Sequence, residues 1–218
     1  MSKIRLASAC ALAFALPVIA ASAQAEEIYL GAGFPGVLLG YAHPLGERFT
    51  VRADYATLGS RSANGERDGV DYQGHIKLGR AGLFGDVFVL GGLRLTGGVT
   101  FNQHQLDLKF QGNGGEVTIG DATVVATSSD TLSARAKYPT TTPYFGIGYG
   151  HQQSDPGLGF VFDLGASFGK PKVDTTISQS LLTKVGQSNY DQQVDELHSD
   201  VDKVKVFPQL TIGLNYRF

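Results

Sequence analysis

The chain of 218 residues is poor in several kinds of residue, and each shortage excludes a class of protein. Its one cysteine cannot form an internal bridge, which excludes a disulfide-stapled scaffold. Only 17% of the residues are charged and 42% are hydrophobic, which excludes an intrinsically disordered chain. A formal net charge of −2 supplies no basic field, so we expect no nucleic-acid partner. Beyond the N-terminal segment no run reaches the ~20 apolar residues of a transmembrane helix.

Residues 1–25 have the three-part layout of a secretory signal peptide. Two basic residues precede an apolar stretch, 6–21, and an Ala-Gln-Ala sequence with the spacing of a cleavage site ends at Ala25. A membrane-anchor helix is the alternative, but the stretch is short for a span and Pro17 interrupts it. We therefore predict Sec-type export, cleavage near Ala25 and one mature domain over residues 26–218, which lacks the single cysteine.

The mature chain alternates between apolar and polar side chains with a period of two. It is rich in glycine (29) and in Phe (13) and Tyr (9), although it has no Trp. In the last segment, 207–218, apolar residues from Leu210 onward occupy every second position, and Gln, Thr, Gly, Asn and Arg lie between them. Segments 158–169 and 91–105 repeat the pattern. Each segment is therefore predicted to be a strand with one apolar and one polar face.

Eight such segments predict an all-β fold. They are 27–34, 36–44, 48–58, 69–80, 91–105, 141–150, 158–169 and 207–218. A soluble β protein turns its apolar faces inward, whereas a membrane barrel turns them outward. The opposite faces here carry glycine and small polar residues, which suit the narrow lumen of a small barrel. We therefore predict a closed antiparallel transmembrane β-barrel of eight strands.

The connections between these segments fall into two groups. An even number of strands places both ends of the chain on one side, where we predict short turns at 44–48, 81–86 and 151–159. On the opposite, outer side we predict a very short loop at 34–36 and a polar loop at 60–68.

Two long insertions also belong to the outer side. Residues 106–140 alternate at first, which indicates a hairpin above the membrane or two more spanning strands, for a total of ten. Residues 171–206 change period, and their apolar positions recur three or four residues apart over 189–204. This spacing predicts a short amphipathic helix. The helix could be a solvated cap, a partner-binding element or a plug of the lumen.

Charged residues on the predicted inner faces indicate a lumen plugged by ion pairs. An isolated ion is costly in a desolvated interior, so these charges should pair, with Arg94 and Asp163 at the centre. The predicted network is Arg52, Asp54, Asp71, Lys77, Arg94, Asp163 and Arg217. On the outer faces, interfacial aromatic belts are predicted, although strict alternation would turn Tyr29 inward. The belt residues are Tyr29, Tyr41, Tyr55, Tyr72, Tyr149, Tyr216 and Phe218.

The sequence offers no catalytic, cofactor or metal site. His198 and Ser199 are adjacent and near Asp195, but neighbours on a helix do not face each other. His75 and His104 fall on predicted lumen faces, and the histidines share no metal-ligand spacing. We therefore expect no enzyme, no cofactor and no bound metal.

The C-terminal strand resembles the terminal assembly signal of Gram-negative outer-membrane proteins. The residues that carry this resemblance are Leu210, Ile212, Leu214, Tyr216 and Phe218. The resemblance implies location in the outer membrane, contact with its lipids, and recognition by the barrel-assembly machinery and periplasmic chaperones during biogenesis.

The whole mature chain resembles the small eight-stranded barrels of the OmpA, OmpX and OmpW groups. More narrowly, residues 93–98 and the Phe207-Pro208 pair resemble an uncharacterised group of proteobacterial barrel proteins. A barrel fold does not fix an activity. We expect a structural or surface-interaction role with a lumen filled by side chains. The OmpW resemblance implies an alternative, a narrow pore for small or apolar solutes, and a lipid-modifying enzyme is a more distant alternative.

Overall fold

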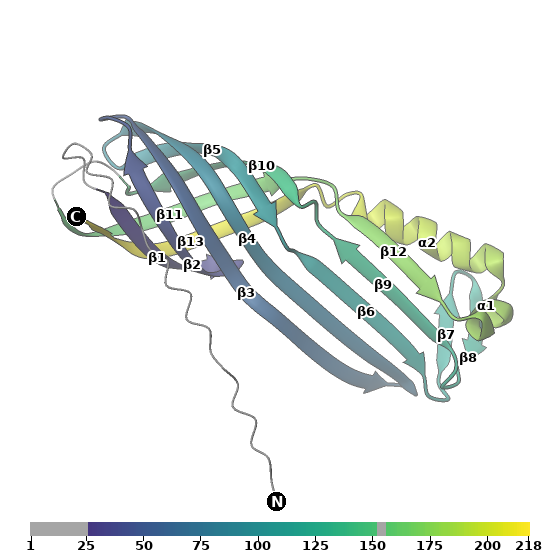
Figure 1. Cartoon of the computed structure of the whole chain (residues 1–218). Helices are drawn as coiled ribbons and strands as arrows, with labels where there is room; N and C mark the ends of the chain where they lie inside the picture. The colour runs from purple at the N-terminus through teal and green to yellow at the C-terminus, as the bar shows by residue number, and fades with distance from the viewer. Residues whose placement is uncertain (1–25, 152–155) are drawn as a thin grey trace, which may run out of the picture.

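The computed structural model describes residues 26–151 and 156–218. The predicted signal peptide, 1–25, and residues 152–155 of a predicted turn lie outside the described residues. The described residues form an elongated β structure with two helices at the end far from the C-terminus (Figure 1).

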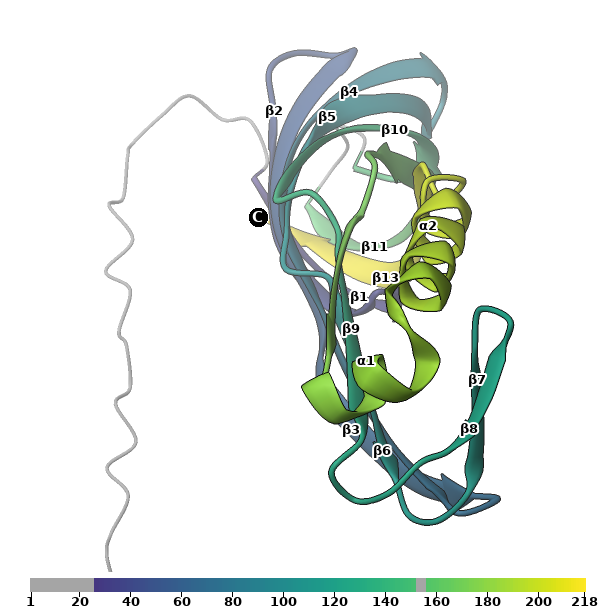
Figure 2. The same ribbon diagram turned by 90° about the vertical axis from the view of Figure 1, so that its right-hand side faces the viewer.

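Eight strands form a ring, seen behind the helices in Figure 2. They are β1 (Glu27–Phe34), β2 (Gly36–Pro44), β3 (Phe49–Arg67), β4 (Val70–Leu90), β5 (Leu93–Asn102), β10 (Thr141–Tyr149), β11 (Gly157–Phe168) and β13 (Val206–Arg217). Each pairs with the next in that order, β13 pairs with β1, and all of these pairs are antiparallel. The predicted count of eight is confirmed. The alternative of ten is wrong, because the additional strands do not enter the ring.

The additional strands build a second part, which we call the extension. Beyond the ring, β3 and β4 continue side by side to Arg67 and Val70. The outer part of β4 then pairs with β6 (Gln105–Gly112), which pairs with β9 (Thr131–Lys137), which pairs with β12 (Lys172–Ile177). The insertion 106–140 is therefore a hairpin beyond the ring. Its tip carries the small hairpin of β7 (Glu116–Ile119) and β8 (Ala122–Val125).

Two predicted connections are wrong because β3 and β4 are much longer than the sequence indicated. Residues 81–86 are not a turn but the middle of β4, and the chain reverses at Gly91 and Gly92 instead. Gly82 and Asp86 face the crowded interior of the ring, where a small residue and a charged one are needed for packing rather than for turning, whereas Gly85 faces outward. Residues 60–68 are not a loop either, since β3 continues through them to Arg67.

The predicted helix at 189–204 is observed as α2 (Gln187–Val201), and a second helix, α1 (Gln179–Val185), precedes it. Ser178 caps α1, since its side-chain oxygen accepts a hydrogen bond from the backbone N–H of Leu181. Leu181 and Val185 pack with Ile119 against apolar side chains of the extension. Within the described residues, no helix is long and apolar enough to cross a membrane.

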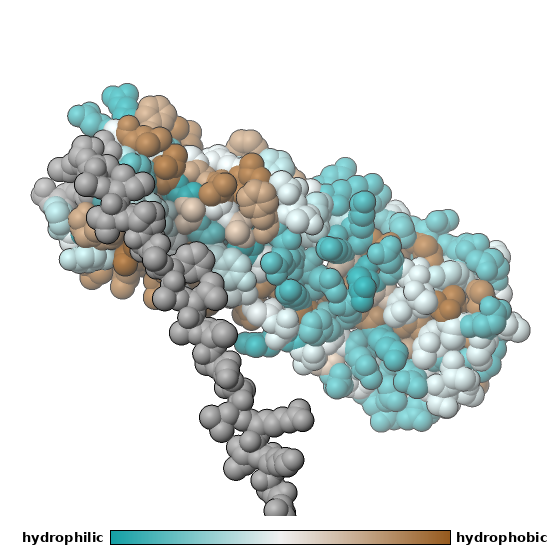
Figure 3. Space-filling model, in the orientation of Figure 1, coloured by the Kyte–Doolittle hydropathy of each residue, from teal (hydrophilic) through white to brown (hydrophobic). Residues whose placement is uncertain are grey.

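The two faces of the sheet exchange polarity where the ring gives way to the extension. Leu83 on β4 points outward and is 55% exposed, whereas Asp86, three residues farther along on the inner face, is 1% exposed. Farther along β4, the outward side chains become His75 and Lys77, and the inner face becomes apolar at Ile76. Apolar residues accordingly gather over the ring and polar residues over the extension (Figure 3). An apolar outside with a charged inside fits hydrocarbon, and the reverse fits water.

Candidate functional site

Two arginines and two aspartates alternate at the centre of the ring. Arg94 is fully buried, and its Nη2 and Nη1 atoms donate to Oδ1 of Asp163 (2.8 Å) and Oδ1 of Asp86 (3.2 Å). Arg52 donates to the same two carboxylates, from Nε to Oδ2 of Asp86 (2.5 Å) and from Nη2 to Oδ1 of Asp163 (3.2 Å). Each carboxylate is therefore shared by both guanidinium groups, which is the compensation that buried charges require.

Further ion pairs lie beside this central set. Arg80 pairs with Asp54. Near the ends of the chain, Nε of Arg217 donates to Oε2 of Glu27 (3.1 Å), and the other oxygen of Glu27 contacts Nδ1 of His151. With the central set, these pairs place four arginines against four carboxylates, so the interior of the ring is balanced in charge.

The structure places the seven residues of the predicted network in two regions. Arg52, Arg94 and Asp163 meet at the centre, and Asp54 and Arg217 form the neighbouring pairs. Asp71 and Lys77 were assigned to the lumen wrongly, because β4 has already left the ring there and both lie on the outward face of the extension.

Sequence reasoning missed three members of the interior: Glu27, Arg80 and Asp86. Arg80 and Asp86 lie an even number of residues apart on one strand, so period-two alternation would have placed both on the inner face. The interpretation of 81–86 as a turn concealed this signal. Glu27 is the first residue of β1, where alternation gives little information.

Aromatic side chains such as Tyr29, Phe84 and Tyr144 share the remaining interior with small polar residues, and glycines on the facing strands make room for the larger side chains. A Cβ atom at Gly148 would lie 2.6 Å from Cζ of Arg94, and one at Gly40 would overlap the ring of Tyr29. The cavity bounded by the central ion pairs, Phe84 and Tyr144 has a volume of about 10 Å³. That volume holds about one water molecule. The centre of the ring, around the ion pairs, is therefore closely packed.

Two residues of the predicted aromatic belts lie elsewhere. Tyr29 faces inward with 2% of its surface exposed, as strict alternation indicated, and contacts His151 edge-on. Tyr72 lies on the extension, beyond the ring. The other belt residues are exposed. The five residues of the predicted assembly signal are also exposed on the outward side of the last strand.

The histidines occupy separate environments. His104 is buried on the inner face and stacks on Phe207 with 4.1 Å between ring centroids. His75, predicted to face the lumen, instead lies on the outward face of the extension, where Nδ1 is 2.9 Å from Oγ of Ser62. In residues 26–151 and 156–218, no three His, Cys, Asp or Glu side chains are grouped to hold a metal ion.

The inner face of the extension carries an apolar groove with a volume of about 570 Å³. Tyr72, Leu108 and Phe110 supply its large side chains, and Tyr72 and Leu108 are each about half exposed. Small residues of β3, β4 and β9 form its floor: Ala63, Gly65, Gly74 and Ala134. The groove is continuous with the apolar cluster that holds α1, which also includes Phe110 and Leu132.

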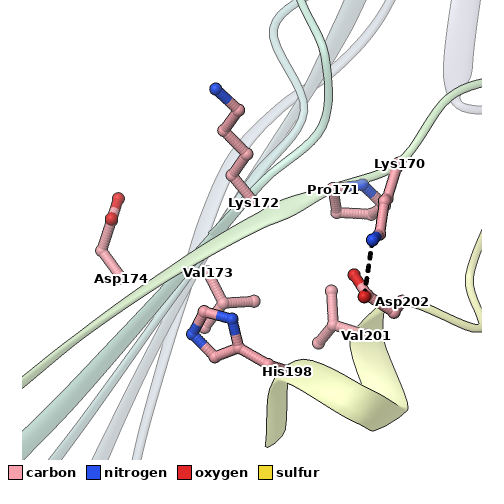
Figure 4. Close-up of a pocket in the computed structure, with 8 residues that line it drawn as sticks. All are labelled: Lys170, Pro171, Lys172, Val173, Asp174, His198, Val201 and Asp202. Carbon is pink, nitrogen blue, oxygen red and sulfur yellow. Dashed lines mark ion pairs between the residues drawn. The ribbon is translucent and has the colours of Figure 1, made fainter. Parts of the chain in front are cut away.

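A second, more polar groove of about 470 Å³ separates α2 from the start of β12 (Figure 4). Lys170 and Asp202 close one end of this groove with an ion pair of 2.6 Å. Val173 and Val201 form its apolar part, and His198 points toward β12 from the helix. The ion pair thus links the loop after β11 to the residues that follow α2.

Asp130 fixes α1 to the extension. This buried carboxylate accepts hydrogen bonds from Nζ of Lys184 (2.6 Å), Oγ of Ser180 (2.6 Å) and the backbone N–H of Thr127 (2.7 Å). The bond from Lys184, followed by the others, holds the pKa of Asp130 well below its usual range. The ionised form is therefore the one that holds α1 in place.

Replacing Asp130 with Asn should destabilise the docking of α1 by about 1.5–3 kcal/mol, since it removes charge-assisted hydrogen bonds. Hydrogen exchange of the α1 amides measures this effect. Because folding lowers the pKa of Asp130, its contribution is present above the unfolded value of about 3.9 and is lost as the pH falls below that value. Protection of α1 should therefore fall under acid conditions in the wild type and change little in the variant. Equal acid sensitivity of the two proteins would contradict this role.

Comparison with known proteins identifies the fold alone. No family model and no curated protein matches the chain. Two solved structures from Acinetobacter baumannii are similar to it. CarO2 has 17% identity and a TM-score of 0.57 over 89% of this chain and 99% of its own, and CarO has 14% identity and a TM-score of 0.55 over 88% and 97%. Both are outer-membrane β-barrel proteins. This chain therefore has the fold of an outer-membrane β-barrel.

Proposed function

We propose that this outer-membrane β-barrel is a non-conducting membrane protein that presents the extension as an interaction surface outside the cell. The closely packed centre of the ring supports the proposed lack of conductance. Solute passage would have to break the ion pairs that Arg52 and Arg94 make with two shared carboxylates. Removing one partner from such a set leaves a buried charge uncompensated, at a cost of several kcal/mol.

The orientation follows from the lengths of the connections. Both chain ends and the connections β2–β3, β4–β5 and β10–β11 lie at one end of the ring, and the two long insertions lie at the other, together with the short β1–β2 turn. In outer-membrane barrels the short turns face the periplasm and the long loops face outward. This arrangement supports an extracellular position for the extension.

The exposed apolar groove supports the second half of the proposal. Tyr72 and Leu108 lie beyond the ring, on a sheet whose other face is polar, so neither hydrocarbon nor the core of the protein covers them. Exposed apolar patches outside a membrane mark sites of interaction. Since no catalytic grouping accompanies the groove, we expect binding rather than catalysis.

Planar-bilayer recordings test the proposed lack of conductance. The folded monomer should give no steady single-channel current, because the cavity beside the central ion pairs holds only about one water molecule. Liposome swelling with small neutral sugars and with apolar solutes should likewise match that of protein-free vesicles. Steady current or solute entry from folded monomer would instead support the narrow pore. A matched preparation that has been heated until it unfolds controls for leakage through damaged bilayers.

A further inference from the structure

Three lysines stand in register on the outward face of the extension. Lys77 of β4 is opposite Gln105 of β6, Gln105 is opposite Lys137 of β9, and Lys137 is opposite Lys172 of β12. Residues paired in this way share one face of the sheet. We call Lys77, Lys137 and Lys172 the lysine row. All three side chains are exposed.

The lysine row lies where the apolar outside of the ring ends. On β4 the outward side of the ring extends from Val89 to Gly79. A tilted strand spans a membrane with about 9–11 residues, so this stretch is long enough to do so. Lys77 is the next outward residue. Lys137 lies four residues before the start of β10, and Lys172 lies four residues after the end of β11. The row therefore borders the hydrocarbon-facing surface.

The lysine row lacks compensating charges of its own. Within the described parts of the chain, none of its three members takes part in an ion pair. The acidic residues of the adjacent row, Asp107 and Asp174, flank Arg135, which binds Asp107 at 2.5 Å. Lys137 and Lys172 are directly opposite each other, and such like-charge pairs destabilise a sheet. An external anion would remove this repulsion.

The positive charge of the lysine row contrasts with the acidic composition of the whole chain. The sequence has 18 basic and 20 acidic residues, and two of the basic ones belong to the predicted signal peptide. Despite this acidic excess, the border of the ring is cationic at the row. Farther out, at the β3–β4 tip, Glu66, Asp68 and Asp71 outnumber Arg67, which pairs with Asp68 at 3.4 Å. Positive charge next to the bilayer and negative charge away from it favours contact with anionic headgroups.

We propose that the lysine row binds the phosphate groups of anionic lipid headgroups in the leaflet that surrounds the ring. Flexible lysine stems let each ammonium group reach down to headgroup level while the strand remains upright. The contact would fix the depth and rotation of the extension relative to the bilayer. The proposal rests on the proposed function in one respect, namely that the ring spans the membrane.

Spin-labelled lipids test the proposal in vesicles of phosphatidylcholine that contain the full-length folded barrel. The measured quantity is the association of labelled phosphatidylglycerol with the protein relative to that of labelled phosphatidylcholine. The wild type should prefer the anionic lipid. Replacing all three lysines with Gln should reduce this preference by about fivefold or more, since one lysine near an anionic surface contributes about that factor. High salt should weaken the wild-type preference.

Single variants provide the matched comparison. Lys109 is exposed on the same face of the extension, two rows farther from the ring, opposite Ser133 of β9. Lys137→Gln should lower the anionic preference, and Lys109→Gln should leave it unchanged. Equal effects of the two variants, or an unchanged preference in the triple variant, would overturn the proposal. A wild type that immobilises neither lipid would instead overturn the membrane-spanning ring itself. Should the triple variant fail to fold, the two single variants decide the matter.

Discussion

Replacing Arg94 with Met should lower the free energy of unfolding by about 3–5 kcal/mol. Arg94 is fully buried and donates to Asp86, Asp163, Thr96 and the carbonyl of Gly150. Without it, Arg52 alone faces two carboxylates, and one negative charge remains uncompensated in the interior. Urea unfolding in phospholipid vesicles, followed by the shift in gel mobility between folded and heated protein, measures the loss.

A double variant separates the lost charge from lost packing. Arg94→Met combined with Asp163→Leu removes one charge of each sign and leaves Arg52 paired with Asp86. Replacing a buried ion pair with apolar side chains is often close to neutral, so the double variant should recover most of the stability. If the double variant lost as much stability as Arg94→Met and Asp163→Leu lose together, the uncompensated charge would not be the cause of the loss in Arg94→Met.

Replacing Leu95 with Arg should cost up to about 2–4 kcal/mol of folding free energy in a bilayer, because the residue lies on the outward side of the ring, which faces hydrocarbon. Leu95 is 52% exposed, and its neighbour Arg94 on the opposite face is fully buried. Leu164, which is 45% exposed on β11, should respond similarly. Unfolding of each variant in vesicles measures the cost.

Asn64→Arg is the control for this experiment. Asn64 is exposed on the outward side of β3, beyond the ring, and is opposite the uncharged Gln73, so an arginine there contacts water or headgroups. Its replacement should change stability by less than about 1 kcal/mol. An equal cost at positions 95 and 64 would mean that the ring is not surrounded by hydrocarbon.

Alternation made the strands of the ring predictable. One face of each strand meets lipid and the other meets a narrow interior, so the apolar positions of β11 and β13 recur strictly at every second residue. The same rule concealed the extension. Leu106, Leu108 and Phe110 alternate just as residues of the ring do, but they face inward, beyond the ring. A period of two says which side chains share a face and does not say which solvent that face meets.

The partners within the interior were not predictable from one sequence. Arg52 meets Asp86 and Asp163, which are 34 and 111 residues away along the chain. Such contacts depend on the stagger between strands, and a shift of one residue would turn every side chain to the other face. The sequence identified three of the four central residues because each is a charge on an otherwise apolar or small-residue strand. Asp86 was missed because it ends the segment 81–86, whose two glycines and terminal Asp predicted a turn.

β3 and β4 are continuous where the polarity of the two faces changes, and this continuity determines the position of the groove relative to the ring. Both strands pass from the ring into the extension without a linker, and they are paired on either side of a single irregularity between Thr57 and Gly59. From Lys77 to Tyr72 is five residues, or roughly 17 Å along the strand. The groove is thus held at a fixed distance beyond the ring, and a partner that binds there, as the proposed function has it, would have to approach at that distance from the bilayer.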